Sequence, residues 1–296
     1  MARKGSNETR AARFTFGFAA SFVRPTLALM LKRTWVGLGS IKPGSIIVSN
    51  HISELDPLIV AEALYAHKLL PRFLAKSSLF KIPVVGRILK ATGQIPVERG
   101  GPGAKLSLEA AAEVIGRGGV IIIYPEGTLT KDPDKWPMQA RTGAARLALK
   151  TNAPIVPVVH WGDQELLGGK PRRLRLFPRK ATVVMAGSEI EMDDLREGPM
   201  TRSVLDEATN RIMKHMMYLV ADLRGEEPPE VPWSPTGDRE VGLSGAKRRN
   251  GAAKSKRTGS ERRKSQAGVK TSASEEISAS GQISALEHST ALEACA

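Results

Sequence analysis

The chain has 296 residues, a formal net charge of +14 and a hydrophobic content of 41%. This length suits one mid-sized domain with a single large core plus terminal segments, and it leaves little room for two complete enzyme domains. The one cysteine is Cys295, which excludes a disulfide framework, a cysteine zinc site and a cysteine nucleophile in the core. We therefore expect cytosol-facing chemistry.

The positive charge is concentrated in two segments that flank a nearly neutral middle. Residues 1–33 hold seven Lys and Arg against one acidic residue, and residues 247–264 hold nine against one. Such segments favour an anionic surface, either a phospholipid headgroup layer or nucleic acid. The basic tail has no interleaved aromatic residues that could stack on bases, which argues against nucleic acid.

Residues 1–40 are predicted to form a membrane-associating helical segment. Phe14, Phe18 and Phe22 recur at i, i+4 and i+8, so they share one face of an amphipathic helix. No run of eighteen apolar residues occurs, so we expect this helix to lie on a membrane surface rather than to cross it. The expected location is peripheral, on the cytoplasmic face of the cell membrane. The alternative is a helix that packs on the domain's own core.

Residues 41–228 are predicted to form one α/β domain with a single core, because short β-branched runs alternate with helical periodicity. This alternation predicts a mixed, largely buried sheet with helices on both faces. Pro157 lies inside an apolar run and indicates an edge strand or a bulge. The expected strands are residues 45–49, 72–75, 94–97, 120–124, 155–159 and 182–186, and the expected helices are residues 58–66, 105–115, 142–149 and 203–223.

The last predicted helix ends at Gly225, because glycine commonly follows a helix C-terminus. Residues 229–296 come after it and are rich in Ser, Ala, Gly, Lys and Arg, with almost no large apolar side chains. Such a segment cannot bury enough surface to offset the entropy lost on ordering. We expect residues 229–296 to be a disordered basic tail.

A histidine and an aspartate follow the first predicted strand of the domain. On a continuous helix, their spacing of five residues would turn His51 and Asp56 roughly 140° apart. Asp56 before Pro57 is typical of a helix N-cap, which leaves His51 in the preceding turn within reach of the carboxylate. A carboxylate bonded to one imidazole nitrogen leaves the other to accept a proton from an alcohol, so the pair predicts general-base catalysis. The alternative is that Asp56 only caps the helix.

Two further segments place polar residues at the ends of predicted strands. Lys76 and Arg99 are cations near strand ends, which suits a phosphate, although charged side chains there are commonly only solvated. Glu126, Gly127 and Thr128 follow the most apolar strand in a sharp turn, the usual place for functional groups in an α/β sheet. The alternative is an ordinary exit of the chain from a strand into a loop.

In this order, the segments resemble the four sequence blocks of the glycerolipid acyltransferase family, typified by bacterial 1-acyl-glycerol-3-phosphate acyltransferases. The first block is the HX4D motif with an asparagine before it. The family commonly has arginine after the threonine of the third block, where this sequence has Leu129. The matches are Asn50, His51 and Asp56 for the first block, Lys76, Gly86, Gly93 and Arg99 for the second, Tyr124, Pro125, Glu126, Gly127 and Thr128 for the third, and Val156, Pro157 and Val158 for the fourth.

The resemblance implies transfer of a fatty-acyl group from acyl-CoA or acyl carrier protein to 1-acyl-sn-glycerol 3-phosphate, which gives phosphatidic acid for phospholipid biosynthesis. It implies His51 as the general base, Asp56 as its partner, the two cations as the grip on the acceptor phosphate, and the turn after the apolar strand as the wall of the acceptor pocket. It implies no metal and no cofactor besides the acyl co-substrate. A different glycerolipid or lysolipid acceptor is one alternative, and a nucleic-acid- or membrane-binding protein is another. A serine hydrolase would need a Gly-x-Ser-x-Gly elbow, which the sequence lacks.

Overall fold

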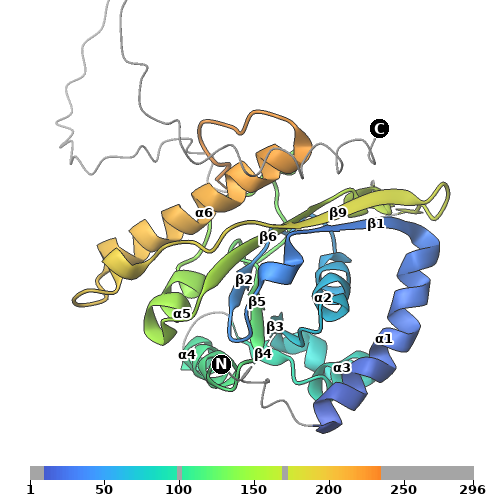
Figure 1. The fold of residues 1–296 in the computed structure, drawn as a ribbon, viewed down its shortest axis with the longest axis horizontal. Coiled ribbons are helices and arrows are strands. Elements are labelled where there is room, and N and C mark those ends of the chain that lie inside the picture. Colours follow the sequence, from blue (N-terminus) through green and yellow to red (C-terminus); the bar gives the residue numbers. More distant parts are fainter. Residues whose placement is uncertain (1–9, 99–101, 169–172, 235–296) are drawn as a thin grey trace, which may run out of the picture. The chain divides into compact units, whose positions relative to one another are not determined.

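A seven-stranded mixed sheet organises this computed structural model, which describes residues 10–98, 102–168 and 173–234 (Figure 1). The strands lie in the order β1-β9-β6-β2-β5-β3-β4. They are β1 (Leu31–Val36), β2 (Ile46–Val48), β3 (Pro71–Lys76), β4 (Ile95–Val97), β5 (Val120–Ile123), β6 (Ile155–Trp161) and β9 (Lys180–Ala186). A separate short hairpin joins β7 (Leu167–Gly168) to β8 (Arg173–Leu174).

Six α-helices accompany the sheet within the described residues: α1 (Arg10–Met30), α2 (Asp56–Ala66), α3 (Pro83–Ala91), α4 (Pro102–Gly116), α5 (Gly143–Thr151) and α6 (Arg202–Arg224). Helices α4, α5 and α6 cover one face of the sheet, and α1 and α2 cover the other (Figure 1). Successive residues of β2 serve the two faces in turn, because Ile46 and Val48 pack with the first set of helices and Ile47 with the second. The buried α/β sheet with helices on both faces is confirmed.

The strands at the centre of the sheet are apolar runs buried on both faces. Strand β2 pairs in parallel with β5 on one side and with β6 on the other. After β2 the chain builds β3, β4 and β5 on one side, and then crosses through α5 to β6 on the other side. Such a switch point opens a crevice at the carboxyl ends of the strands. The segments that follow β2, β5 and β6 are therefore brought together.

The N-terminal segment differs from the helical segment expected for residues 1–40. Helix α1 ends at Met30, and the chain continues at once into β1, which pairs in parallel with β9 along its whole length. Leu31 is fully buried, so residues 31–36 belong to the sheet. The strand was not predicted because no glycine, proline or turn residue separates it from the helix. Among the described helices, none is long and apolar enough to cross a membrane.

Pro157 was expected to mark an edge strand or a bulge, and the edge strand is wrong, because β6 lies inside the sheet between β2 and β9. Its pairing with β9 runs from Val158 to Trp161, so Pro157 stands just beyond the end of that ladder. The missing N–H of the proline therefore interrupts no paired stretch with β9. Gly187 N donates to the Pro157 oxygen at 2.9 Å.

The C-terminal boundary also differs from the expectation. Helix α6 starts at the N-cap Thr201, whose hydroxyl accepts from Val204 N, and ends at Gly225 with a φ of 65°, as predicted. Residues 229–234 do not begin a disordered tail, because Gln139 N donates to the Trp233 oxygen at 3.1 Å. The remainder of the expected tail, residues 235–296, lies outside the described residues.

Candidate active site

The histidine and the aspartate of the HX4D motif meet at the carboxyl end of β2. His51 Nδ1 lies 2.8 Å from Asp56 Oδ2. The Asp56 side chain is fully buried, whereas 18% of the His51 side chain is exposed. Because the carboxylate can only accept, Nδ1 carries the proton and the ring's basic lone pair is on Nε2. The geometry is that of a dyad with one partner buried and the other reaching the surface.

The aspartate reaches back to the histidine from a position one residue further into the helix than expected. Leu55 is the N-cap of α2, and Asp56 is its first residue, with Pro57 next. Asp56 Oδ2 accepts hydrogen bonds from Ile52 N at 2.7 Å and from Ser53 N at 3.0 Å. The carboxylate therefore closes the turn that carries His51, and it does not cap the N–H groups of its own helix. The predicted contact is correct, and the predicted N-cap is wrong.

The loop after β5 supplies an aromatic neighbour for the histidine. The Tyr124 ring stacks on the His51 ring with a centroid distance of 4.3 Å and an interplanar angle of 23°. Phe73 from β3 stacks behind Tyr124 at 6.2 Å. The loop also binds the backbone of the catalytic turn, because Thr130 N donates to the His51 oxygen at 2.7 Å. These contacts fix the plane of the imidazole. The sequence analysis did not predict this role for Tyr124.

Glu126 is buried beneath the same turn. Its Oε1 accepts from His51 N at 3.3 Å, and its Oε2 accepts from Met138 N at 3.0 Å. Burial raises the pKa of Glu126 to about 7, although the two backbone N–H groups act in the opposite direction. Through its bond to His51 N, Glu126 holds the catalytic turn in place.

Of the remaining predicted site residues, Gly127 and Thr128 belong to the loop after β5. Lys76 is exposed at the end of β3, and Arg99 lies outside the described residues. Gly127 has a φ of 70°, and an added Cβ there would lie 3.3 Å from Arg141 Nε. Thr128 is half-buried in the same loop. The Arg141 side chain therefore lies against Gly127, in the turn of the third sequence block.

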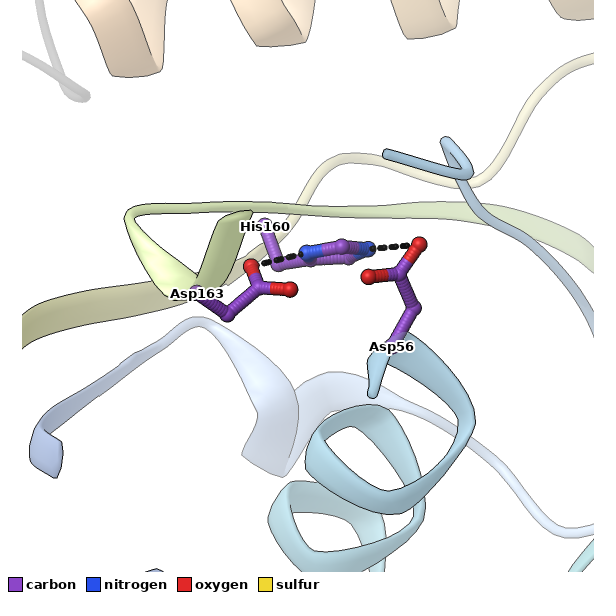
Figure 2. Close-up of side chains that lie close together, drawn as sticks. All are labelled: Asp56, His160 and Asp163. Carbon is purple, nitrogen blue, oxygen red and sulfur yellow. Dashed lines mark hydrogen bonds and ion pairs between the residues drawn. The ribbon is translucent and has the colours of Figure 1, made fainter. Parts of the chain in front are cut away.

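A second histidine lies behind the dyad, fully buried at the end of β6 (Figure 2). His160 Nδ1 lies 2.8 Å from Asp163 Oδ1, and its Nε2 lies 3.0 Å from the Asn50 oxygen and 3.6 Å from Asp56 Oδ2. The Asn50 side chain pairs with the His160 backbone through two hydrogen bonds of 3.0 Å. The sequence analysis missed His160 and Asp163, and their only signal was a histidine at the end of an apolar strand with an aspartate three residues later.

The pKa values of His160, Asp163 and Asp56 depend on one another. Burial lowers the pKa of His160, but Asp163 and Asp56 outweigh that effect and raise it to about 9. Burial likewise raises the pKa of Asp163, and the neighbouring imidazolium overcomes it, so that the pKa is lowered. Burial raises the pKa of Asp56 well above its usual range, opposed by His160. Of the two carboxylates, Asp56 is therefore the one whose charged form depends more on a cation beside it.

The same three side chains have the ligand types of a metal site, since their nearest donor atoms lie within 4.8 Å of one another. A metal would need a ring nitrogen of His160 with a lone pair available. Both ring nitrogens instead face acceptors, the Asn50 oxygen and Asp163 Oδ1. These contacts fit a protonated His160 between two carboxylates better than they fit a bound metal ion.

The part of the chain that carries this site is similar to a known sequence family. Residues 30–161 match the family model described as Acyltransferase. The matched range runs from the start of β1 to the end of β6 and contains the HX4D dyad, Glu126 and His160.

Curated relatives share this part of the chain. A 1-acyl-sn-glycerol-3-phosphate acyltransferase of Helicobacter pylori is 31% identical over 51% of this chain and 62% of its own length. One of Borreliella burgdorferi is 36% identical over 40% of this chain and 45% of its own length. A chloroplastic one of Brassica napus is 31% identical over 41% and 34%. The chain thus spans between about a third and three fifths of the lengths of these relatives.

A solved structure shares the fold. The crystal structure of the 1-acyl-sn-glycerophosphate acyltransferase PlsC from Thermotoga maritima superposes with a TM-score of 0.53 at 18% sequence identity. The match covers 71% of this chain and 81% of that one. The superposition covers a larger share of the chain than residues 30–161, which the family model matches.

Proposed function

We propose that this chain, which belongs to the PlsC-like glycerolipid acyltransferase family, transfers a fatty-acyl group from an acyl thioester to the free hydroxyl of 1-acyl-sn-glycerol 3-phosphate. The observation that carries the proposal is the 2.8 Å contact between a buried Asp56 and a partly exposed His51. The names of the curated relatives support the acceptor. The product would be phosphatidic acid, an intermediate of phospholipid biosynthesis.

The chemistry follows from the orientation of the imidazole. With Nδ1–H donated to Asp56, His51 Nε2 accepts the proton of the acceptor hydroxyl as the oxygen attacks the thioester carbonyl. The tetrahedral intermediate collapses, the carbon–sulfur bond breaks, and the thiolate takes the proton from Nε2. The imidazolium that exists between these two transfers is stabilised by the Asp56 carboxylate. No acyl-enzyme forms and no cofactor besides the acyl-CoA or acyl carrier protein is required.

Cations near the site favour an acceptor that carries a phosphate. Lys76 and Arg99 were predicted to hold it, and Arg141 adds a third cation, exposed and placed against Gly127. Arg141 N also donates to the Pro125 oxygen at 3.0 Å, which ties this segment to the turn. A guanidinium here can replace the arginine that the family commonly has where this chain has Leu129.

The test is to identify the products by mass spectrometry. One labelled acyl-CoA is offered with 1-acyl-sn-glycerol 3-phosphate, with glycerol 3-phosphate and with a neutral monoacylglycerol. We expect phosphatidic acid from the first acceptor, and a roughly 10- to 100-fold rise in its KM in Arg141→Ala, the loss of one charge-assisted contact. Preferred acylation of the neutral acceptor by the wild type would refute the proposed substrate.

We also propose that the protein acts at an anionic phospholipid surface, on the cytoplasmic side of a membrane. Three phenylalanines of α1, Phe14, Phe18 and Phe22, are between 61% and 77% exposed, which is unusual for rings of that size. Phe16, on the opposite side of the helix, is buried and lies under the Arg72 guanidinium at 4.8 Å. The exposed rings are thus not used for packing within the described part of the chain.

Helix α3 offers a second surface of the same character. Its apolar side chains at Ile82, Val84, Val85 and Ile88 are at least 40% exposed. Exposed basic residues alternate with them, namely Lys81, Arg87 and Lys90. Apolar side chains interleaved with basic ones suit the boundary between acyl chains and anionic headgroups.

Binding to phosphatidylglycerol vesicles tests this proposal. The triple variant with serine at Phe14, Phe18 and Phe22 should lose most of its sedimentation with vesicles and keep its Tm. The matched control, Phe16→Ser, should keep vesicle binding and lower the Tm, because its ring is buried. A triple variant that binds vesicles like the wild type but melts earlier would show that the rings pack against protein.

A further inference from the structure

We propose that His160 and Asp163 are a buried positioning pair for acyl transfer, in which a permanently charged imidazolium holds both the backbone and the carboxylate that orient His51. The inference rests on the proposed function for its activity measurements. Neither residue reaches the surface, since both are fully buried. They therefore act through Asn50 and Asp56, without contact with substrate.

The charge on His160 follows from its neighbours. A neutral imidazole has one nitrogen that donates and one that accepts. Here Nδ1 faces the Asp163 carboxylate at 2.8 Å and Nε2 faces the Asn50 carbonyl oxygen at 3.0 Å. Both partners are acceptors, so both ring nitrogens donate and the ring is an imidazolium. The pKa of about 9 agrees with this reading.

The imidazolium fixes one peptide unit of the catalytic turn. The Asn50 oxygen belongs to the peptide that joins Asn50 to His51, and it accepts from His160 Nε2. The N–H of that same peptide donates to Glu126 Oε1 at 3.3 Å. The peptide plane is therefore held at both ends by buried side chains, His160 at the oxygen and Glu126 at the N–H. Because the Cα of His51 follows this plane directly, its orientation sets the direction in which the imidazole leaves the backbone.

The imidazolium also stands beside the carboxylate of the dyad. Its Nε2 lies 3.6 Å from Asp56 Oδ2, the same oxygen that accepts from His51 Nδ1. The other oxygens, Asp56 Oδ1 and Asp163 Oδ2, are both buried and point toward each other in Figure 2. Two buried carboxylates this close would not both remain ionised without the cation between them. Burial and Asp163 raise the pKa of Asp56, and His160 is the neighbour that lowers it, so the imidazolium favours the charged form of Asp56 when His51 gains a proton.

A purely structural ion network is the competing explanation, because removing one partner of a buried ion pair destabilises a fold whether or not the pair serves catalysis. The kinetic parameters distinguish the two. A positioning pair affects the transition state, so its loss lowers kcat and leaves the KM of donor and acceptor nearly unchanged. A structural pair lowers only stability.

The experiment compares Asp163→Asn and His160→Gln with a matched control, Glu62→Gln. Glu62 is a buried carboxylate on α2 that pairs with Arg33 at 2.7 Å and Arg24 at 3.4 Å, and its hydrogen bonds among the described residues are with these arginines and not with the dyad. We expect kcat to fall roughly 10- to 100-fold in both site variants, with KM within about twofold. The control should lose stability and keep its kcat. A kcat near the wild-type value in folded Asp163→Asn would overturn the proposal, and so would an equal loss of kcat in the control.

A spectroscopic measurement does not depend on activity. In protein labelled with ¹⁵N-histidine, His160 should show two protonated ring nitrogens at about pH 8, and Asp163→Asn should reduce them to one. The signal is identified by its loss in His160→Gln. A singly protonated His160 in the wild type would overturn the inference even if acyl transfer is observed. Absence of acyl transfer in the wild type, with a doubly protonated His160, would instead refute the proposed function.

Discussion

Two buried carboxylates shape the turn that carries His51. Asp56 accepts from Ile52 N and Ser53 N, and Glu126 accepts from His51 N and from the next loop. Hydrogen bonds to a charged acceptor contribute about 1.5 to 3 kcal/mol each. The backbone N–H groups of the turn have no regular secondary structure to pair with, so side-chain carboxylates determine its conformation.

The raised pKa of Glu126 predicts a pH-dependent stability. Folding raises this pKa from 4.5 to about 7, so the folded protein holds the proton more tightly than the unfolded chain. The stabilisation from that proton is complete below about pH 4.5 and is lost as the pH rises through 7. Relative to Glu126→Gln, which cannot titrate, the wild type should lose up to about 3 kcal/mol of unfolding free energy over this range.

Urea unfolding of both proteins at the two ends of that range measures the difference. The loss of one backbone hydrogen bond in Glu126→Gln is the same at each pH, so it cancels when the two curves are compared. Parallel pH dependences for the wild type and the variant would contradict the raised pKa.

The difference between predicted and unpredicted site residues has a physical cause. His51 and Asp56 are five residues apart, so local turn and helix-start chemistry is enough to bring them together. Asn50 and His160 are 110 residues apart and meet only because β2 pairs with β6. No local pattern encodes that pairing, so His160 and Asp163 could not be recognised from the sequence.

At the scale of elements, α3 depends on a glycine for its packing. A Cβ added at Gly86 would lie 2.2 Å from the Phe80 oxygen, so the helix can approach the preceding turn only without a side chain there. We expect Gly86→Ala to cost about 1 to 3 kcal/mol of unfolding free energy, the usual cost of overpacking. Denaturant unfolding measures it.

Gly116, the last residue of α4, is the matched control. An added Cβ there meets nothing within 4 Å. Gly116→Ala should be neutral, or stabilise by up to about 1 kcal/mol through helix propensity. Equal effects of the two substitutions would show that the close approach to Phe80 is not limiting.

Helices and strands whose apolar sequence pattern matches their burial were predicted. Those whose apolar pattern does not match their burial were missed. The central strands β2 and β5 are continuous apolar runs buried on both faces, and the sequence analysis found both. Helix α3 was missed because its apolar residues face outward, contrary to the rule that an apolar stripe faces the core. Strand β1 was missed because its sequence, with Lys32 and Arg33 in it, does not alternate cleanly.

At the scale of the molecule, Trp233 still contacts the domain through Gln139 N, and residues 1–239 cluster as one compact unit. We therefore expect truncation after Arg239 to leave the Tm and the activity on soluble substrates unchanged. Truncation after Pro228 should lower stability by about 1 kcal/mol, because it removes the Trp233 oxygen that accepts from Gln139 N. Calorimetry of the two truncated proteins tests this boundary. A protein ending at Arg239 that no longer folds would refute it.

The central claim is that His51 is the general base, and the most direct measurement is the initial rate of phosphatidic acid formation by His51→Ala. The control is His67→Ala, which removes a histidine that contacts only the Ala63 oxygen of its own helix among the described contacts. We predict a rate at least about 100-fold below the wild type for His51→Ala with an unchanged Tm, and a wild-type rate for His67→Ala. A His51→Ala protein that keeps more than about a tenth of the wild-type rate would contradict general-base catalysis by this residue.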